Sequence, residues 1–126
     1  MTNSWTRACL VAASVSGLVS VVAGAAAAHG GANSTAQDWL RTGSTYEMTH
    51  TLAVFACVFV AQKGGRRAIV AASLFLAGSV LFSGSLYALA LGASPAVALA
   101  TPFGGLAFMA GWIVLAWACA VLRKAE

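Results

Sequence analysis

Two histidines, two tyrosines and one glutamate stand out in this chain as side chains that could do chemistry. His29 follows a run of alanines, Tyr46, Glu47 and His50 follow one another closely, and Tyr87 lies in a later apolar stretch. Neutral imidazole is a common ligand of metal ions and of haem iron. A carboxylate beside a phenol and an imidazole can instead hold a proton or form hydrogen bonds to a quinone or a lipid headgroup.

Hydroxyl side chains accompany these residues in the second half of the chain. We expect one polar cluster, which consists of His29, Tyr46, Glu47, His50, Ser83, Ser85, Tyr87 and Thr101. Polar side chains inside a membrane tend to face other helices and are therefore candidates for function. They can also bond only to one another and so set the packing of the helices. The residue types by themselves are compatible with both roles.

Neither metal binding nor catalysis has a recognisable motif here. His29 and His50 are weak candidates for metal ligands because they form no HxxxH pair, and we expect no cofactor. Cys9, Cys57 and Cys119 have no CxxC spacing, so we expect free thiols. No nucleophile, pair of carboxylates or metal-ligand set indicates an enzyme.

The composition is that of a membrane protein. The chain is 60% hydrophobic and 8% charged, with a mean hydropathy of +0.86, whereas about 25% of residues are charged in soluble proteins. The net charge of +4 comes from short clusters between apolar runs. Because no basic stripe exists, we expect no binding to nucleic acid.

The apolar runs predict an all-α integral membrane four-helix bundle that forms a single transmembrane domain over residues 1–126. The predicted helices cover residues 8–29, 45–62, 67–91 and 102–122, with a short interfacial helix at 34–42 in the first outer loop. Each long helix should cross a hydrocarbon core of about 30 Å.

The second membrane helix is the least apolar of the four. Only 11 residues, Thr51 to Ala61, lack strongly polar groups, and a spanning helix needs roughly 17 to 25. Ser44 and Glu47 fit a capping box, so we predict that this helix begins near Thr45.

Local signals also place the ends of the neighbouring elements. Ser34 with Gln37 is a second capping box, and Gly43 can end the interfacial helix. Thr101 is a predicted N-cap, with Pro102 at the first position of the fourth helix.

Small residues indicate where helices approach one another closely. Ala12, Ser16, Ser20, Gly24 and Ala28 recur every four residues in the first helix, and Ala71, Gly78, Ser85 and Gly92 recur every seven in the third. The residues that we expect at helix contacts are Ser16, Ser20, Gly24, Gly78, Gly84, Gly104, Gly105 and Gly111. We expect the Trp112 side chain to fill space between helices or to anchor its helix at the membrane interface.

The basic residues predict the orientation. Arg7, Lys63, Arg66, Arg67, Arg123 and Lys124 would lie at one end of the helices, and only Arg41 at the other. By the positive-inside rule, we expect both termini to be cytoplasmic. We expect a multi-pass protein of the bacterial inner membrane or its mitochondrial equivalent.

The segment before His29 has two interpretations. Arg7, an apolar core and an Ala-x-Ala ending at Ala28 match a cleaved signal peptide, after which His29 could chelate copper as the new N-terminus. The apolar stretch is 21 residues long, whereas the apolar region of a signal peptide usually has about 7 to 15 residues. The stretch also carries small residues at which another helix could pack. We therefore expect a retained helix.

Four motifs resemble those of a known family. They are "AAHG", "WLRTGSTYEMTHTLAVF", "LFSGSLYALAL" and "TPFGGLAFMAGW", and in this order they are similar to the motifs of domain-of-unknown-function family 423. Its members are small four-helix membrane proteins, which include the animal transmembrane protein 256. The resemblance implies a retained first helix and no known activity. Where the family usually has Gly-Ala-Phe-Gly-Ala-His, this chain has "GAAAAH".

Two classes of function follow. The first is a small structural or accessory subunit that packs against itself or a larger membrane complex, with membrane lipids around it. The alternative is a ligand-binding or redox protein that uses the extracytoplasmic His/Tyr/Ser cluster for a quinone, lipid headgroup, haem or copper.

Overall fold

The computed structural model describes residues 3–122, which form helices joined by short connections, with no strand among them. The elements are α1 (Ser4–His29), α2 (Ser34–Gln62), α3 (Ala68–Ala90), a 3-10 helix η1 (Pro95–Leu99) and α4 (Ala100–Ala120). The predicted all-α fold with four long helices is therefore confirmed.

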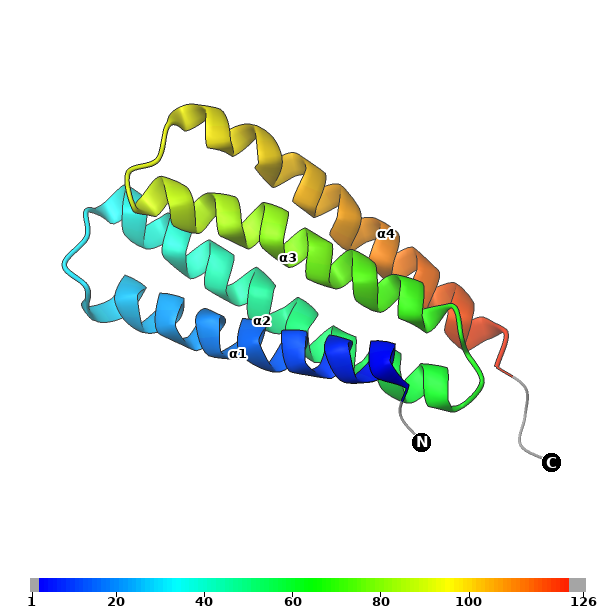
Figure 1. Cartoon of the computed structure of the whole chain (residues 1–126). Coiled ribbons are helices and arrows are strands. Elements are labelled where there is room, and N and C mark those ends of the chain that lie inside the picture. The colour runs from blue at the N-terminus through cyan, green and yellow to red at the C-terminus, as the bar shows by residue number, and fades with distance from the viewer. Residues whose placement is uncertain (1–2, 123–126) are drawn as a thin grey trace.

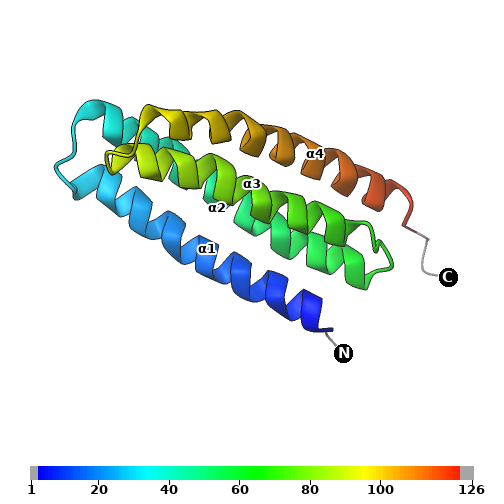
Figure 2. The same cartoon turned by 45° about the horizontal axis from the view of Figure 1, so that its top comes forward.

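The helices run antiparallel and pack mainly in chain order. α1 packs on α2, α2 on α3 and α3 on α4 (Figures 1 and 2), whereas α1 and α4 share no contact within the part of the chain that the structure describes. The start of α1, the α2–α3 connection and the end of α4 lie at the same end of the molecule (Figure 1). α2 and α3 are thus the inner helices, and α1 and α4 flank them.

Three of the helical segments are long and apolar enough to cross a membrane. They are α1, α3 and the continuous segment Pro95–Ala120, with mean hydropathies of 2.0, 2.0 and 1.8 in their most apolar windows. α2 falls short because its first half is polar. From Arg41 to Lys63, however, α2 rises about 33 Å, which matches the thickness of the hydrocarbon core.

The predicted break between residues 42 and 45 is wrong, because residues 34–62 form one helix of 29 residues. Ser44 and Glu47 do not form a capping box. The Ser44 hydroxyl donates to the Ser20 carbonyl across the α1–α2 contact, and Glu47 accepts hydrogen bonds from two other helices. Residues 34–42 do not form a separate interfacial helix, since these side chains bond to neighbouring helices and leave the backbone of α2 continuous.

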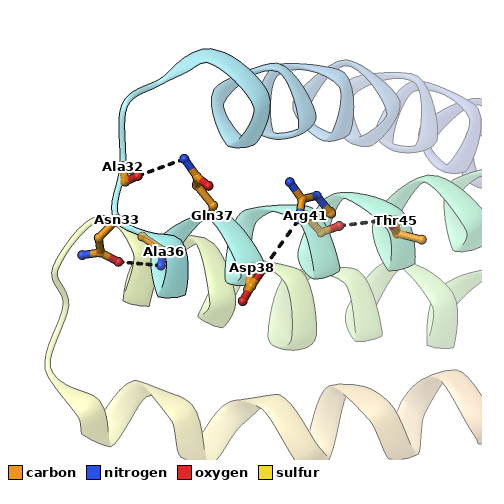
Figure 3. Close-up of polar contacts among 7 residues, drawn as sticks. All are labelled: Ala32, Asn33, Ala36, Gln37, Asp38, Arg41 and Thr45. Carbon is orange, nitrogen blue, oxygen red and sulfur yellow. Dashed lines mark hydrogen bonds and ion pairs between the residues drawn. The ribbon is translucent and has the colours of Figure 1, made fainter.

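The N-terminal cap of α2 lies one residue before the predicted one. The Asn33 side chain accepts a hydrogen bond from the Ala36 N–H at 2.9 Å, and the Gln37 side chain donates to the Ala32 carbonyl at 3.0 Å (Figure 3). In the next turn Asp38 and Arg41 form an exposed ion pair at 3.6 Å. The first turns of α2 are therefore polar on the outside.

The start of α4 also differs from the prediction. The Ser94 side chain caps η1, and η1 continues directly into α4, which begins at Ala100. Thr101 consequently lies inside the first turn of α4 and is not its N-cap. Its hydroxyl bonds instead to Ser85 on α3 at 2.7 Å.

The buried stripe of α1 follows a seven-residue repeat and not the predicted four-residue one. Its buried residues are Thr6, Cys9, Ala13, Ser20, Ala23 and Ala27. With the half-buried Ser16, successive members of this stripe are alternately three and four residues apart. Ala12 and Ala28 are exposed. A line drawn every four residues drifts around a helix of 3.6 residues per turn, whereas a seven-residue repeat stays on one face.

Glycines allow α3 and α4 to approach closely. A Cβ atom on Gly78 would lie 2.7 Å from Phe108 Cε1, one on Gly111 would lie 2.6 Å from Phe75 Cε1, and one on Gly104 would collide with the Phe82 backbone. Gly105 reaches only ordinary contact distance, and Gly92 lies beyond the end of α3 with φ +91°. Gly84 differs from the other glycines within α3 and α4, because a Cβ there would meet nothing within 4 Å.

Candidate functional site

Glu47 is at the centre of a hydrogen-bonded group that joins three helices. Its carboxylate, on α2, accepts from the Ser16 hydroxyl of α1 at 2.7 Å and from the Tyr87 hydroxyl of α3 at 2.5 Å. Only 6% of Glu47 is exposed. Hydrogen bonds to a charged acceptor are shorter and stronger than those between neutral groups. We call Ser16, Glu47 and Tyr87 the carboxylate centre.

Neighbouring residues determine how closely Tyr87 approaches α2. The Tyr87 ring lies over Gly43, where a Cβ would come within 2.6 Å of Tyr87 Cε1. One turn before Tyr87, the buried Ser83 hydroxyl donates to the Gly43 carbonyl at 2.7 Å. Gly43 was predicted to end a helix, but in the structure it lets α3 reach the backbone of α2.

His50 forms a second centre, between α2 and α4. Its Nδ1 lies 2.6 Å from the Tyr46 carbonyl, and its Nε2 lies 3.1 Å from the indole nitrogen of Trp112. A carbonyl only accepts and an indole N–H only donates, so a neutral imidazole with its proton on Nδ1 satisfies both. The His50 ring stacks on Phe108, with centroids 3.6 Å apart and planes 8° from parallel. We call His50, Trp112 and Phe108 the imidazole centre.

The arrangement of the imidazole centre leaves His50 without a free ring nitrogen. Its exposed fraction is 4%, and Phe75 packs on it from α3 at a centroid distance of 5.4 Å. A ligand to a metal or a haem iron needs a free imidazole lone pair. Here the lone pair of Nε2 already accepts the Trp112 proton.

Hydroxyl pairs fix the register of the remaining contacts. Ser20 and Ser44 each donate to the other's backbone carbonyl, at 2.9 and 2.7 Å, and so join α1 to α2. The buried Ser85 hydroxyl bonds to the Phe82 carbonyl and to the Thr101 hydroxyl, which joins α3 to α4. These hydrogen bonds lie where α1 contacts α2 and where α3 contacts α4.

The single polar cluster expected from the sequence is divided in the structure. Glu47 and Tyr87 come together, Ser85 pairs with Thr101, and His50 bonds to a tryptophan outside the expected set. Tyr46 is 46% exposed and contributes its carbonyl to His50, while its ring packs on Phe82 at 4.7 Å.

His29 lies apart from all of these residues. It ends α1 and is exposed, whereas His50 contacts α4, which α1 does not touch within residues 3–122. The two weak candidates for metal ligands are therefore not brought together. Among the residues that the structure describes, no three His, Cys, Asp or Glu side chains gather as a metal site would require.

Sequence reasoning missed the two donors that complete the centres. From the sequence we expected Ser16 at a helix contact and Trp112 in bulk packing or anchoring. Each of them donates a hydrogen bond to a buried acceptor on α2. A signal for Trp112 did exist, since an indole N–H in an apolar helix needs a partner. For Ser16 the signal was that Glu47 is the only acidic residue within the apolar part of the helices.

Together the apolar helices and the buried polar contacts define a class, that of helical integral membrane proteins with a hydrogen-bonded polar core. The family model described as "Protein of unknown function (DUF423)" matches residues 23–105. The chain belongs to this family, as the motifs in the sequence indicated. No solved structure matches this chain.

Relatives cover nearly the whole chain. A protein of Haemophilus influenzae named UPF0382 membrane protein is 43% identical over 86% of this chain and 90% of its own length. The UPF0382 inner membrane protein YgdD of Escherichia coli K12 is 39% identical over 94% of both chains. The UPF0382 membrane protein YwdK of Bacillus subtilis is 36% identical over 84% of this chain and 90% of its own length.

Proposed function

We propose that this chain is a multi-pass inner-membrane protein that acts as a small structural or accessory subunit. The names of the Escherichia coli relatives support the inner membrane, and the lengths and apolar character of α1, α3 and Pro95–Ala120 support several crossings. α2 would be the remaining crossing, held between the other helices with its polar side chains turned inward.

The distribution of basic residues supports cytoplasmic termini. Arg7, Lys63, Arg66 and Arg67 lie at the end of the molecule that holds the α2–α3 connection (Figure 1), and Arg41 lies toward the other end. Arg123 and Lys124, which belong to the same argument, lie outside the described residues. Basic residues favour the cytoplasmic side, so both ends of the chain would face the cytoplasm.

The observation that carries the accessory role is that nearly all hydrogen bonds of the buried polar side chains are made within the chain. Both nitrogens of His50 and both oxygens of Glu47 have protein partners. Among the described residues, the Thr51 hydroxyl is the one buried side-chain polar atom without a partner. Polar residues that bond to each other across helices stabilise and orient the helices.

The alternative role, as a ligand-binding or redox protein that uses the outer His/Tyr/Ser cluster, has weaker support. The residues of that cluster are divided among separate contacts, and His29 lies at the exposed end of α1. A haem or a copper ion would have to replace the Trp112 bond to His50.

Most of the small residues that we expected at helix contacts are used within the chain, so partner surfaces would lie elsewhere. Gly78, Gly104 and Gly111 are used between α3 and α4, and Ser16 and Ser20 between α1 and α2. The outer faces of the flanking helices α1 and α4 are free to meet lipids, a second copy or a larger complex, because neither helix covers the other.

Native mass spectrometry of the protein, extracted gently from its own membranes into lipid nanodiscs, tests this function. We expect a second copy or a larger subunit at fixed stoichiometry, with no haem, copper or quinone mass. A small-molecule mass at one per chain that disappears in the His50→Phe variant would refute the accessory role and support the alternative. The exposed Asp38→Asn variant is the control, because it alters a carboxylate far from His50.

A further inference from the structure

A groove of about 500 Å³ lies between α1 and α3 and reaches the carboxylate centre. Its walls are apolar: Val15 and Val19 come from α1, and Leu76 and Val80 come from α3. Val15, Val19 and Val80 are 55%, 41% and 73% exposed, so the groove opens on the outer surface of the helices. Glu47 of α2 lies at its base.

The groove exists because α1 and α3 touch each other much less than either touches α2. Gly84 lies in its wall, and a Cβ atom there would meet nothing within 4 Å. The other buried glycines of α3 and α4 lie against aromatic side chains or backbone. Because Gly84 has no side chain, the groove beside it contains a space that no side chain of the described residues fills.

The carboxyl group at the base of the groove has no cation beside it among the described residues. The two partners of Glu47, Ser16 and Tyr87, are neutral hydroxyls, and the ion pair found among the described residues is the exposed Asp38–Arg41 pair. Buried carboxylates in membrane helices are usually paired, because an unpaired charge in an apolar medium is costly. Hydrogen bonds from two neutral donors would leave an ionised Glu47 without a counter-charge, which a cation in the groove would supply.

With α2 crossing the membrane as proposed above, the position of Glu47 along the helix places its carboxyl group inside the hydrocarbon layer. Glu47 lies six residues from Arg41 and sixteen from Lys63, which correspond to rises of about 9 Å and about 24 Å. A ligand that reaches Glu47 must therefore dissolve in the membrane and enter from the lipid side. Water-soluble ions do not meet this requirement.

From these observations we propose that the α1–α3 groove binds a lipophilic organic cation, whose charge lies against Glu47 and whose apolar body lies along Val15, Val19, Leu76 and Val80. Opposite charge supplies the specificity and the apolar walls supply much of the affinity. This site goes beyond the proposed accessory role and does not depend on it.

Equilibrium binding of radiolabelled dodecylammonium to the full chain in phosphatidylcholine nanodiscs tests the proposal, with protein-free nanodiscs as the blank. We expect saturable binding of one equivalent per chain. Dodecanol, which has the same alkyl chain and no charge, should bind at least tenfold more weakly. Binding no greater than the blank, or equal binding of the alcohol, would overturn the proposal.

Matched variants locate the site. Glu47→Gln keeps an acceptor for Tyr87 and removes the charge, so we expect at least a tenfold loss of affinity. Asp38→Asn removes an exposed carboxylate outside the groove and should bind as the parent does. A Cβ at Gly84 meets nothing within 4 Å, so Gly84→Leu would extend a side chain into the groove and should also lose binding. It provides a second test if Glu47→Gln does not fold. Unchanged binding in a folded Glu47→Gln or Gly84→Leu variant would overturn the assignment.

Discussion

Replacing Trp112 by phenylalanine tests the imidazole centre most directly. The change keeps an aromatic ring on α4 and removes the N–H that His50 Nε2 accepts at 3.1 Å. His50 is 4% exposed, so water cannot replace the lost donor, whereas Trp112 is 46% exposed and loses little buried area. The main cost is thus one buried acceptor without a partner.

The size of this cost follows from the environment. A buried acceptor without a partner costs about 1–3 kcal/mol in soluble proteins. Hydrogen bonds between membrane helices average about 0.6 kcal/mol, with values up to about 1.7. We therefore expect Trp112→Phe to lower the free energy of unfolding by about 1–2 kcal/mol.

The assay is equilibrium unfolding in mixed micelles as the mole fraction of dodecyl sulfate rises, followed by circular dichroism. Trp5→Phe is the control, because Trp5 is 50% exposed near the start of α1, and such surface changes usually stay within about 0.5 kcal/mol. In a double-mutant cycle with His50→Phe, the coupling energy should be about 0.6–1.7 kcal/mol. A Trp112→Phe loss equal to the control's, or a coupling near zero, would refute the hydrogen bond as a stabilising contact.

Three further predictions concern other parts of the structure. Gly104→Ala should destabilise the protein by about 1–3 kcal/mol in the same unfolding assay, because its Cβ would collide with the backbone of α3. Gly84→Ala is the control and should be neutral, because its Cβ meets nothing within 4 Å. Equal effects of the two changes would contradict the close α3–α4 contact. Tyr87→Phe should cost about 1–3 kcal/mol, because it leaves the buried carboxylate with one donor, and a neutral result would show that the bond does not stabilise the fold. In intact cells a membrane-impermeant maleimide should label Ala93→Cys but not Lys63→Cys, and labelling of both or the reverse pattern would contradict cytoplasmic termini.

The number of long helices and their approximate places followed from the sequence alone. Apolar runs separated by charge clusters and glycines leave few alternatives, because the backbone of a membrane-spanning segment must satisfy its own hydrogen bonds. Gly31, Gly64 and Gly92 all adopt positive φ in the three connections. The membrane class and the family also followed, because composition and ordered motifs do not depend on how helices pack.

The start of α2 required the tertiary structure. Ser44 and Glu47 have the types and spacing of a capping box, and a local interpretation ends one helix before them and begins another. In the folded chain Ser16 and Ser20 of α1 offer these side chains partners, and those contacts leave α2 unbroken. Local and long-range hydrogen bonds use the same side-chain atoms, so the sequence near residue 44 could not decide between them.

The grouping of the polar residues also required the tertiary structure. Glu47 and His50 are three residues apart on one helix, yet Glu47 bonds to α1 and α3 while His50 bonds to α4. Three residues correspond to about 300° around a helix, so the two side chains point in directions that differ by roughly 60°, enough to reach different neighbours. The sequence determined which side chains needed buried partners, and the rotation and register of the neighbouring helices decided which partners they have.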